Sequence, residues 1–156
     1  MKKILFIFLA SLFLVGCTKS APVVVKDHQI ISASIGESPD LMLEVVNTPQ
    51  SITQGLSGRD EIGADGMLFI FDQPRRPSFW MKEMKFNLDL IWIRDMKIIE
   101  ITENVLAPDE NTPLNQVPTY SPQQPVDMVL EVAVGRVKDW GIEVGDELDI
   151  PNTSIN

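Results

Sequence analysis

Apolar residues after Asp27 recur mostly at every second position, in short runs broken by Gly, Pro, Asn and Asp. A two-residue period indicates β-strands, because successive side chains of a strand point to opposite faces. The pattern therefore predicts a mainly β domain of the α+β class. Its candidate strands are Gln29–Ile35, Leu41–Val46, Met67–Phe71, Ser78–Lys82, Leu88–Arg94, Lys97–Glu103, Val126–Val132 and Glu147–Ile150.

Two short helices and one long loop are expected between these strands. Thr48 can cap a helix that begins at Pro49 and ends before Gly55. A second helix is predicted at Arg136–Trp140, where the following glycine stops it. The segment 106–125 contains five prolines in twenty residues, which predicts a long extended loop.

The segment NLDLIWIRDMKIIEIT predicts a β-hairpin with Asp95 and Met96 at its tip. Direct pairing from this tip places Trp92 beside Ile99 on one face, and the other face is equally apolar near the tip. A strand with two apolar faces is covered on both sides. We therefore expect a small single-domain β-barrel or sandwich-like fold of mixed or antiparallel strands, with one or two short helices.

Several carboxylates lie inside these apolar strands, namely Glu44, Asp89, Glu100 and Glu131. In the predicted register, Asp89 and Glu100 occupy diagonal positions on one face, roughly 7–8 Å apart. A buried carboxylate costs several kcal/mol unless it is paired or hydrogen-bonded, so we expect Asp89 to be tied to Arg59 or Lys82. Glu44 and Glu131 either have similar partners or point to solvent, and the alternation allows both.

The stretch MKKILFIFLASLFLVGC at the start of the chain has the features of an export signal. Two lysines precede a mainly apolar run of twelve residues, Ile4–Val15, which is short for a membrane span and typical of a signal peptide. Leu14-Val15-Gly16-Cys17 resembles the lipobox of bacterial lipoproteins, whose cysteine is lipidated and becomes the first residue of the mature chain.

The lipobox resemblance implies a domain organisation and an address. Residues 1–16 are the expected signal peptide, 17–27 the lipidated Cys17 and a tether, 28–151 a single β-rich domain, and 152–156 a flexible tail. The expected partner of the N-terminus is the membrane, through the lipid anchor. Because Thr18 rather than aspartate follows the cysteine, the resemblance implies the outer membrane facing the periplasm. In a cell with one membrane it implies the outer face of the plasma membrane.

The composition excludes several classes of function. Lys and Arg number 13 against 22 Asp and Glu, a net charge of −9, and loss of Lys2 and Lys3 with the signal peptide would make it −11. Such a chain repels polyanions, so we expect no nucleic-acid partner. With one cysteine and one histidine, His28, the domain has no disulfide, no cysteine or serine triad and no histidine zinc site. We expect no cofactor and no metal.

Three stretches in the same order resemble the domain of unknown function 192 family: GLSGRDEIGADGMLFIF, SFWMKEMKFNLDLIWI and VLEVAVGRVKDWGIEVGDEL. The resemblance spans Ser32 to Ile150 and implies a compact, mostly β, barrel-like domain. The positions that match recurring family residues are Arg59, Gly66–Phe69, Phe79–Lys82 and Leu88-Asp89. Tyr120 matches a family Tyr-Pro loop only in part, and Arg94–Lys97 replaces the usual hairpin tip. The family carries no assigned activity.

The expected function is a lipid-anchored binding or accessory module of the cell envelope, without catalysis of its own. Its partner would be a small polar ligand or an envelope protein. The predicted pocket combines aromatic surface with hydrogen-bonding charges, from Arg59, Trp80, Lys82, Asp89, Glu100, Tyr120 and Glu131.

Two alternative functions stay open at this point. One is a hydrolase of an envelope glycan, with Asp89 and Glu100 as acid and base, since such pairs work at separations of about 5–9.5 Å. The other is a purely structural partner in an envelope complex. Separately from these functions, Trp80 and Met81 can be core residues while Arg59 or Lys82 neutralises Asp89 as a buried pair, an interpretation that does not exclude a pocket.

Overall fold

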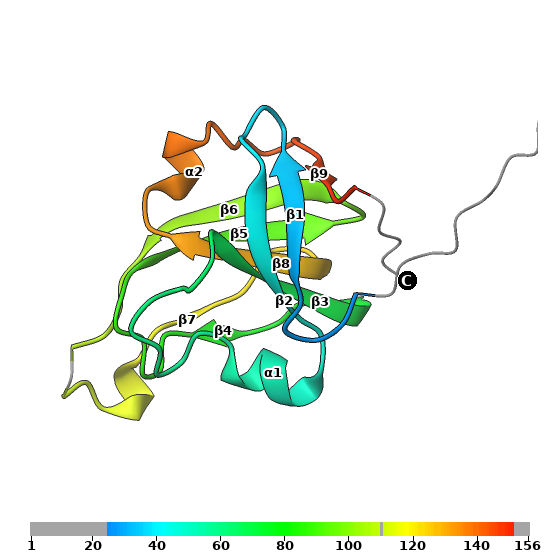
Figure 1. The fold of residues 1–156 in the computed structure, drawn as a ribbon. Helices are drawn as coiled ribbons and strands as arrows, with labels where there is room; N and C mark the ends of the chain where they lie inside the picture. The colour runs from blue at the N-terminus through cyan, green and yellow to red at the C-terminus, as the bar shows by residue number, and fades with distance from the viewer. Residues whose placement is uncertain (1–24, 110, 152–156) are drawn as a thin grey trace, which may run out of the picture.

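The computed structural model describes residues 25–109 and 111–151, which form one mainly β domain (Figure 1). The strands are β1 (Ile30–Ile35), β2 (Leu41–Val46), β3 (Gly66–Arg75), β4 (Phe79–Trp80), β5 (Leu88–Arg94), β6 (Lys97–Val105), β7 (Thr119–Tyr120), β8 (Val126–Ala133) and β9 (Leu148–Asp149). The helices are α1 (Pro49–Gln54) and α2 (Arg136–Asp139), with a single 3-10 turn at Leu114–Gln116. No helix in these described ranges is both long and apolar enough to cross a membrane.

Seven strands form one curled sheet in the order β6-β5-β8-β3-β2-β1-β9, and β4 pairs with β7 separately. β2 and β3 run parallel, whereas the other pairings are antiparallel. The ends of the sheet approach each other, because Ile98 N donates to Asp146 O at 2.9 Å and Leu148 N donates to Met96 O at 2.8 Å. The sheet is thus a half-barrel of mixed strands, which confirms the predicted fold class.

Both faces of the central strands β3, β5 and β8 are buried. The side enclosed by the curl holds an apolar core to which all seven strands contribute, together with α2. The opposite side of β3, β5 and β8, which we call the outer face, carries a second core beneath α1, β4 and β7 (Figure 1). Burial on two faces explains why these strands are almost continuously apolar in sequence, for example Leu88 to Ile93, which are all buried.

The start of α1 is fixed by side-chain capping. Thr48 and Ser51 form a capping box, in which Ser51 N donates to Thr48 Oγ1 at 3.2 Å and Thr48 N donates to Ser51 Oγ at 3.1 Å. Asp27 accepts from Ser51 Oγ at 2.6 Å, and Val25 packs into the core. The folded domain therefore includes residues 25–27, which the sequence analysis assigned to the tether.

The β5–β6 hairpin has the predicted tip but not the predicted register throughout. Asp95 and Met96 adopt positive φ angles of 51° and 63° at the tip, and Ile93 pairs with Ile98 as expected. A bulge between Trp92 and Ile93 then pairs Trp92 with Glu100 instead of Ile99. A shift of one residue turns a side chain to the other face, so Glu100 shares the outer face with Trp92.

The proline-rich segment 106–125 is more ordered than a simple extended loop. It contains the 3-10 turn at Leu114–Gln116 and strand β7. Phe79 pairs with Tyr120 and Trp80 with Thr119, so this segment holds β4 over the outer face. The sequence pattern did not predict β7 because a strand of two residues is too short to show a period.

Asp89 is buried without the cation that the sequence analysis expected. It lies on the opposite side of β5 from Trp92 and is 1% exposed. Its Oδ1 accepts from Asn104 N at 2.9 Å, and its Oδ2 accepts from Gly135 N at 2.8 Å and Val137 N at 3.4 Å. Backbone N–H groups at the start of α2 and on β6 therefore satisfy this carboxylate, which anchors α2 to the sheet. Pairing with Arg59 or Lys82 was the wrong expectation.

We predict that Asp89→Asn destabilises the fold by about 2 kcal/mol, because an amide replaces one acceptor oxygen and leaves a buried backbone N–H unpaired. Chemical denaturation would measure the change. The matched control is Asp149→Asn on the exposed side of β9, which should stay within about 0.5 kcal/mol of the parent. Equal stability of the two variants would show that the hydrogen bonds to Asp89 contribute nothing.

Candidate functional site

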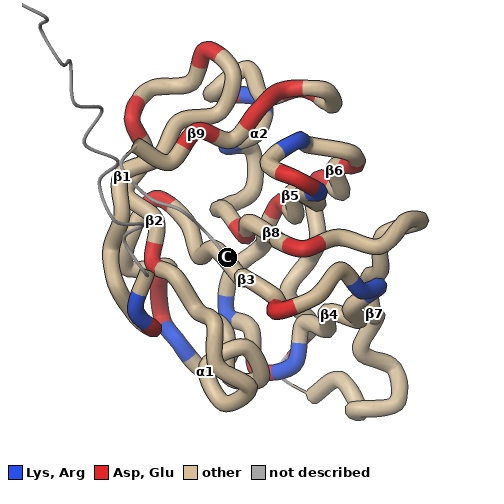
Figure 2. Tube along the Cα trace, turned by 90° about the vertical axis from the view of Figure 1, so that its right-hand side faces the viewer, with Lys and Arg blue, Asp and Glu red and all other residues tan. Residues whose placement is uncertain are grey.

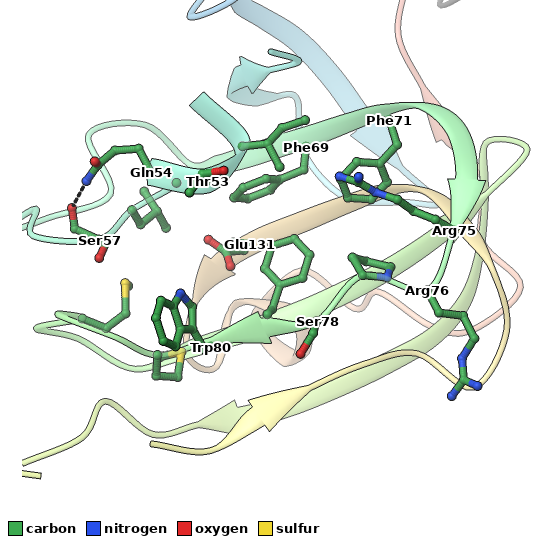
Figure 3. A pocket seen from close by; sticks show the side chains of 17 residues that line it. Thr53, Gln54, Ser57, Phe69, Phe71, Arg75, Arg76, Ser78, Trp80 and Glu131 are labelled. Carbon is green, nitrogen blue, oxygen red and sulfur yellow. Dashed lines mark hydrogen bonds between the residues drawn. The ribbon is translucent and has the colours of Figure 1, made fainter. Parts of the chain in front are cut away.

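A cavity of about 410 Å³ lies on the outer face, between β3, the end of α1 and the segment that contains β4 (Figure 3). Its lining is apolar and polar in about equal measure, and the apolar and aromatic part comes from Ile52, Leu56, Phe69, Phe71, Phe79, Trp80, Met81 and Met84. Thr53, Gln54, Ser57 and Ser78 add hydroxyl and amide groups. This volume falls within the range of about 300–1,000 Å³ that is common for small-molecule sites.

Phe79 is held at the centre of the wall by other aromatic rings. Its ring meets Phe69 edge-on, with centroids 4.9 Å apart and planes at 86°, and meets Trp92 at 5.7 Å and 80°. Edge-to-face pairs of this kind add stability beyond the burial of their area. The pairing of β4 with β7 supports Phe79 from behind, so the wall stands on a strand pair rather than on a free loop.

Trp80, the next residue of β4, gives the cavity an accessible aromatic surface. Its side chain lines the cavity and remains 49% exposed. The ammonium group of Lys82 lies 5.4 Å from the centre of its ring, which is within the range of a cation–π contact. Trp80 is therefore positioned but not covered, so the core interpretation is wrong for Trp80 and holds for Met81, which is buried.

Glu131 of β8 places a carboxyl group inside this cavity. Its strand neighbours are Met67 and Leu90, and its side chain points into the space between Phe69 and Trp80 (Figure 3). It is 6% exposed, and no described residue donates a hydrogen bond to it or forms an ion pair with it. Burial raises the pKa of the Glu131 carboxyl to about 8, so the group is mainly protonated at neutral pH.

Arg75 and Arg76 lie at the rim of the cavity because β3 bulges there. Ile70 pairs with Met128, and the next pair is Arg75 with Val126, so the intervening residues loop out. The guanidinium group of Arg75 lies 4.1 Å from the centre of the Phe71 ring. That of Arg76 turns away from the cavity, and its Nε donates to Pro122 O at 2.9 Å (Figure 3).

Of the seven predicted pocket residues, Trp80 and Glu131 line this cavity, and Arg59 does not. Arg59 forms a bidentate pair with Glu44, with Nη1 to Oε2 at 2.6 Å and Nη2 to Oε1 at 2.9 Å. His28 Nδ1 lies 2.8 Å from the same carboxylate. Hydrogen bonding to Arg59 lowers the pKa of Glu44 below its usual range. Of the two alternatives left open for Glu44, a cationic partner is the one observed.

The remaining predicted residues are separated from one another. Lys82 borders a second hollow, of about 610 Å³, on the far side of Met84. Tyr120 packs behind β4 against the apolar core of the outer face. Glu100 accepts from Gln123 N at 2.8 Å, and Asp89 lies on the other side of the sheet. The expectation that these residues bound one concavity is wrong: a bulge in the β5–β6 hairpin separates Glu100 from Asp89, and Arg59 is held elsewhere by Glu44.

The separation of Asp89 and Glu100 removes the acid and base pair of the hydrolase alternative. Two carboxylates on opposite faces of a sheet cannot flank one glycosidic bond. Asp89 and Glu131 are likewise on opposite faces. Among residues 25–109 and 111–151, no group of three or more His, Cys, Asp or Glu side chains is arranged to hold a metal ion.

Sequence reasoning did not identify Phe69, Phe79 or Arg75 as parts of the site. Phe69 and Phe79 lie in two of the predicted strands, and in the structure they pack in the apolar core of the outer face. The signal that could have found Arg75 is the segment PRRP, in which prolines on both sides of two arginines interrupt a strand. Where a strand is interrupted beside a cationic side chain, that side chain is expected at the rim of a cavity and not within a continuing sheet.

We predict that Glu131 makes the stability of the domain depend on pH. The folded-state pKa of about 8 lies above the ordinary glutamate value of 4.5, so between these values the folded state holds one proton more than the unfolded state. Stability should therefore fall as the pH rises from about 4.5 to about 8, by about 5 kcal/mol for this group. Denaturant titrations of the parent and Glu131→Gln at pH 5 and pH 8.5 would measure the difference.

The control for that measurement is Glu103→Gln on the exposed part of β6, which should keep the parental pH dependence. If Glu131→Gln also keeps it, the carboxyl is not buried in the way described.

Relatives of known structure share this fold. One is a crystal structure of a Sinorhizobium meliloti protein that is described as a candidate transcription regulator. It matches this chain with a TM-score of 0.70 and 29% sequence identity. The match covers 83% of this chain and 99% of that one. A protein of unknown function from Novosphingobium aromaticivorans has a TM-score of 0.67 and 28% identity, covering 84% of this chain and 94% of its own. No curated protein sequence matches this chain.

The family comparison agrees with the resemblance found in the three sequence stretches. The matching family model is described as uncharacterised and spans residues 31–150, which include every strand that lines the cavity. The match covers well over half of the chain. This chain therefore belongs to the domain of unknown function 192 family.

Proposed function

We propose that this protein is a lipid-anchored binding module of the cell envelope, which holds a small polar organic ligand in the cavity around Glu131. It has no catalytic activity of its own in this proposal. The lipid anchor follows from Cys17 and the signal-like N-terminus, which lie outside the described residues. The binding site follows from the cavity and its one buried carboxyl group.

The unpartnered carboxyl group of Glu131 is the observation that carries the proposal. The oxygens of Glu131 stay open to the cavity, because none of the fully buried side-chain oxygens in the described residues lacks a hydrogen-bond partner. Moving a carboxyl group from bulk water to this largely enclosed position still costs roughly 1–3 kcal/mol. Apolar residues of similar size would remove that cost, as they do at Met67 and Leu90 beside it. A carboxyl group that faces an open cavity can instead form hydrogen bonds with a bound molecule. Ligand binding would then explain why a carboxyl group is kept at this position despite its cost in stability.

The wall of the cavity supports the same proposal. Phe79 is fixed by Phe69, Trp92 and the β4–β7 pairing, whereas the neighbouring Trp80 is half exposed. A rigid aromatic wall with one accessible ring binds a flat or ring-shaped molecule at little cost in conformational entropy. The hydroxyl and amide groups around the rim supply further hydrogen bonds.

The description of the Sinorhizobium protein as a candidate transcription regulator does not transfer to this chain. Binding to nucleic acid needs clustered basic residues, and this chain has a net charge of −9. Along the described trace, Lys and Arg are dispersed among Asp and Glu (Figure 2). We therefore include the absence of a nucleic-acid partner in the proposal.

The anchor and the domain have compatible positions along the chain. Cys17 precedes the first described residue, Val25, and lies outside the part of the chain that the structure describes. An export signal ending at Gly16, followed by the lipidated Cys17, would place the module in the periplasm on the outer membrane, or on the outer face of a single membrane. The acidic domain would then attach through lipid and not through contact with anionic headgroups.

A ligand screen would test the binding proposal. The intact protein in lipid nanodiscs would be heated with sugars, amino acids, nucleotides and aromatic acids, and unfolding followed by tryptophan fluorescence. A ligand at 100 times its Kd should stabilise the fold by about 2.7 kcal/mol. Trp80→Ala should remove that shift, whereas Val144→Ala, at an exposed site outside the cavity, should retain it. A shift that survives Trp80→Ala would place the ligand elsewhere, and no shift at all would favour a structural role.

The lipid anchor has its own test. We predict that Cys17→Ser abolishes the incorporation of a labelled fatty acid into the protein, because the thiol that carries the lipid is absent. Intact-mass measurement should show a chain that begins at Cys17 in the parent and in the neighbouring control Thr18→Ser. Fatty-acid label on Cys17→Ser would contradict the lipobox assignment.

A further inference from the structure

We propose that the ligand of this cavity is an anion with a flat apolar body, whose negative group binds Arg75 and whose body lies between Phe79 and Trp80. A neutral Glu131 would donate a hydrogen bond to an oxygen of the ligand. This inference rests on the proposed binding function and adds the chemical class of the ligand.

Arg75 is the first part of the argument. No carboxylate in the described residues pairs with it, although the chain has an excess of acidic residues. Some basic side chains do have such partners, for example Lys85 with Asp60 at 2.6 Å and Arg94 with Asp95 at 3.0 Å, and Arg75 is distinguished from the other unpaired ones by its place on Phe71 at the cavity. The guanidinium group of Arg75 is exposed, stacked on Phe71 and directed back along the cavity (Figure 3).

Stacking makes Arg75 a prepared anion site. The contact with Phe71 restricts the side chain on one face and leaves the N–H groups at the edge of the guanidinium free to donate. A planar guanidinium binds a carboxylate, sulfonate or phosphate through two parallel hydrogen bonds. Less rotational freedom is lost on binding when the side chain is already held.

The aromatic wall indicates the chemical nature of the part of the ligand that does not bind Arg75. The cavity has apolar side chains on β3, β4 and α1, and only hydroxyl and amide groups besides its charged residues. An aromatic or other flat body matches this lining, because Phe79 and Trp80 offer ring surface and the hydroxyl and amide groups can bond to its polar substituents. The oxygen that Glu131 would meet can belong to a hydroxyl, a carbonyl or an ether.

The charge on Glu131 decides whether an anion can enter. Of the described residues that line the cavity, the charged ones besides Glu131 are Arg75 and Arg76, and the neighbours of Glu131 on β3 and β5 are apolar. Asp72 lies in an adjoining hollow that shares Phe71 and Arg75 with the cavity. Burial keeps Glu131 neutral near pH 7, so the net local charge is positive.

A cationic ligand fits these observations less well. It would have to ionise a buried carboxyl group and lie in the same cavity as an unpaired arginine. The overall charge of −9 favours cations only at long range, and salt at physiological strength screens such effects beyond about 8 Å. The groups inside the cavity therefore determine the sign of the ligand.

Three probes that share one ring system would test the charge directly. They are 2-naphthoate, 2-naphthylmethanol and the ammonium form of 2-naphthylmethylamine, titrated calorimetrically at pH 6.5 into the intact protein in nanodiscs, with empty nanodiscs as blank. We expect the acid to bind about tenfold more tightly than the alcohol, which corresponds to about 1.4 kcal/mol. The amine should bind most weakly.

Adjacent arginines provide the matched variants. Arg75→Gln should reduce the affinity for naphthoate about tenfold, to the level of the alcohol. Arg76→Gln should leave it unchanged, because the Arg76 guanidinium turns away to the carbonyl of Pro122. Raising the pH from 6.5 to 9.5 should weaken naphthoate binding in the parent, since Glu131 becomes charged, and Glu131→Gln should remove that pH dependence.

The outcomes separate the two proposals. If the alcohol binds as tightly as the acid and Arg75→Gln has no effect, the anion inference is overturned while the binding function stands. Tightest binding of the amine would overturn it in the same way. If none of the three probes binds at millimolar concentration, while circular dichroism shows a folded protein, both the ligand class and the cavity as a binding site fail.

Discussion

Burial on both faces of β3, β5 and β8 is the constraint on which the rest of this domain depends. Apolar cores on the two sides leave no water to solvate a polar side chain in these strands. Each carboxylate placed there must therefore find a partner or lower its charge. Asp89 takes the first course, through backbone N–H groups of β6 and α2, and Glu131 takes the second, through a raised pKa.

The difference between these two carboxylates separates structure from candidate function. Asp89 has its hydrogen bonds filled by the protein, so it anchors α2 and offers nothing to a ligand. Glu131 is equally buried but remains without a protein partner and faces a cavity. A group that lowers stability and faces open space is more informative about binding than one that the fold already satisfies.

Local chemistry and overall composition indicate different ligands for this protein. The excess of acidic residues suggests attraction of cations, yet the cavity contains a neutral carboxyl and an unpaired arginine held on Phe71. Groups that touch the ligand dominate over distant surface charges, which salt screens more strongly than charges at close range. The shape of the site and the two groups inside it are therefore better guides than the net charge.

The sequence by itself determined the local elements. Its two-residue period placed β2 and β5 with their observed bounds, and Thr48 with Pro49 located α1, because strand alternation and helix capping are local properties. Only the tertiary structure decided which side chains meet. Two bulges in the β5–β6 hairpin and one in β3 moved Glu100 away from Asp89 and brought Arg75 to the cavity. A bulge inserts a residue without changing the alternation of types, so its effect on facing side chains cannot be read before the strands are paired.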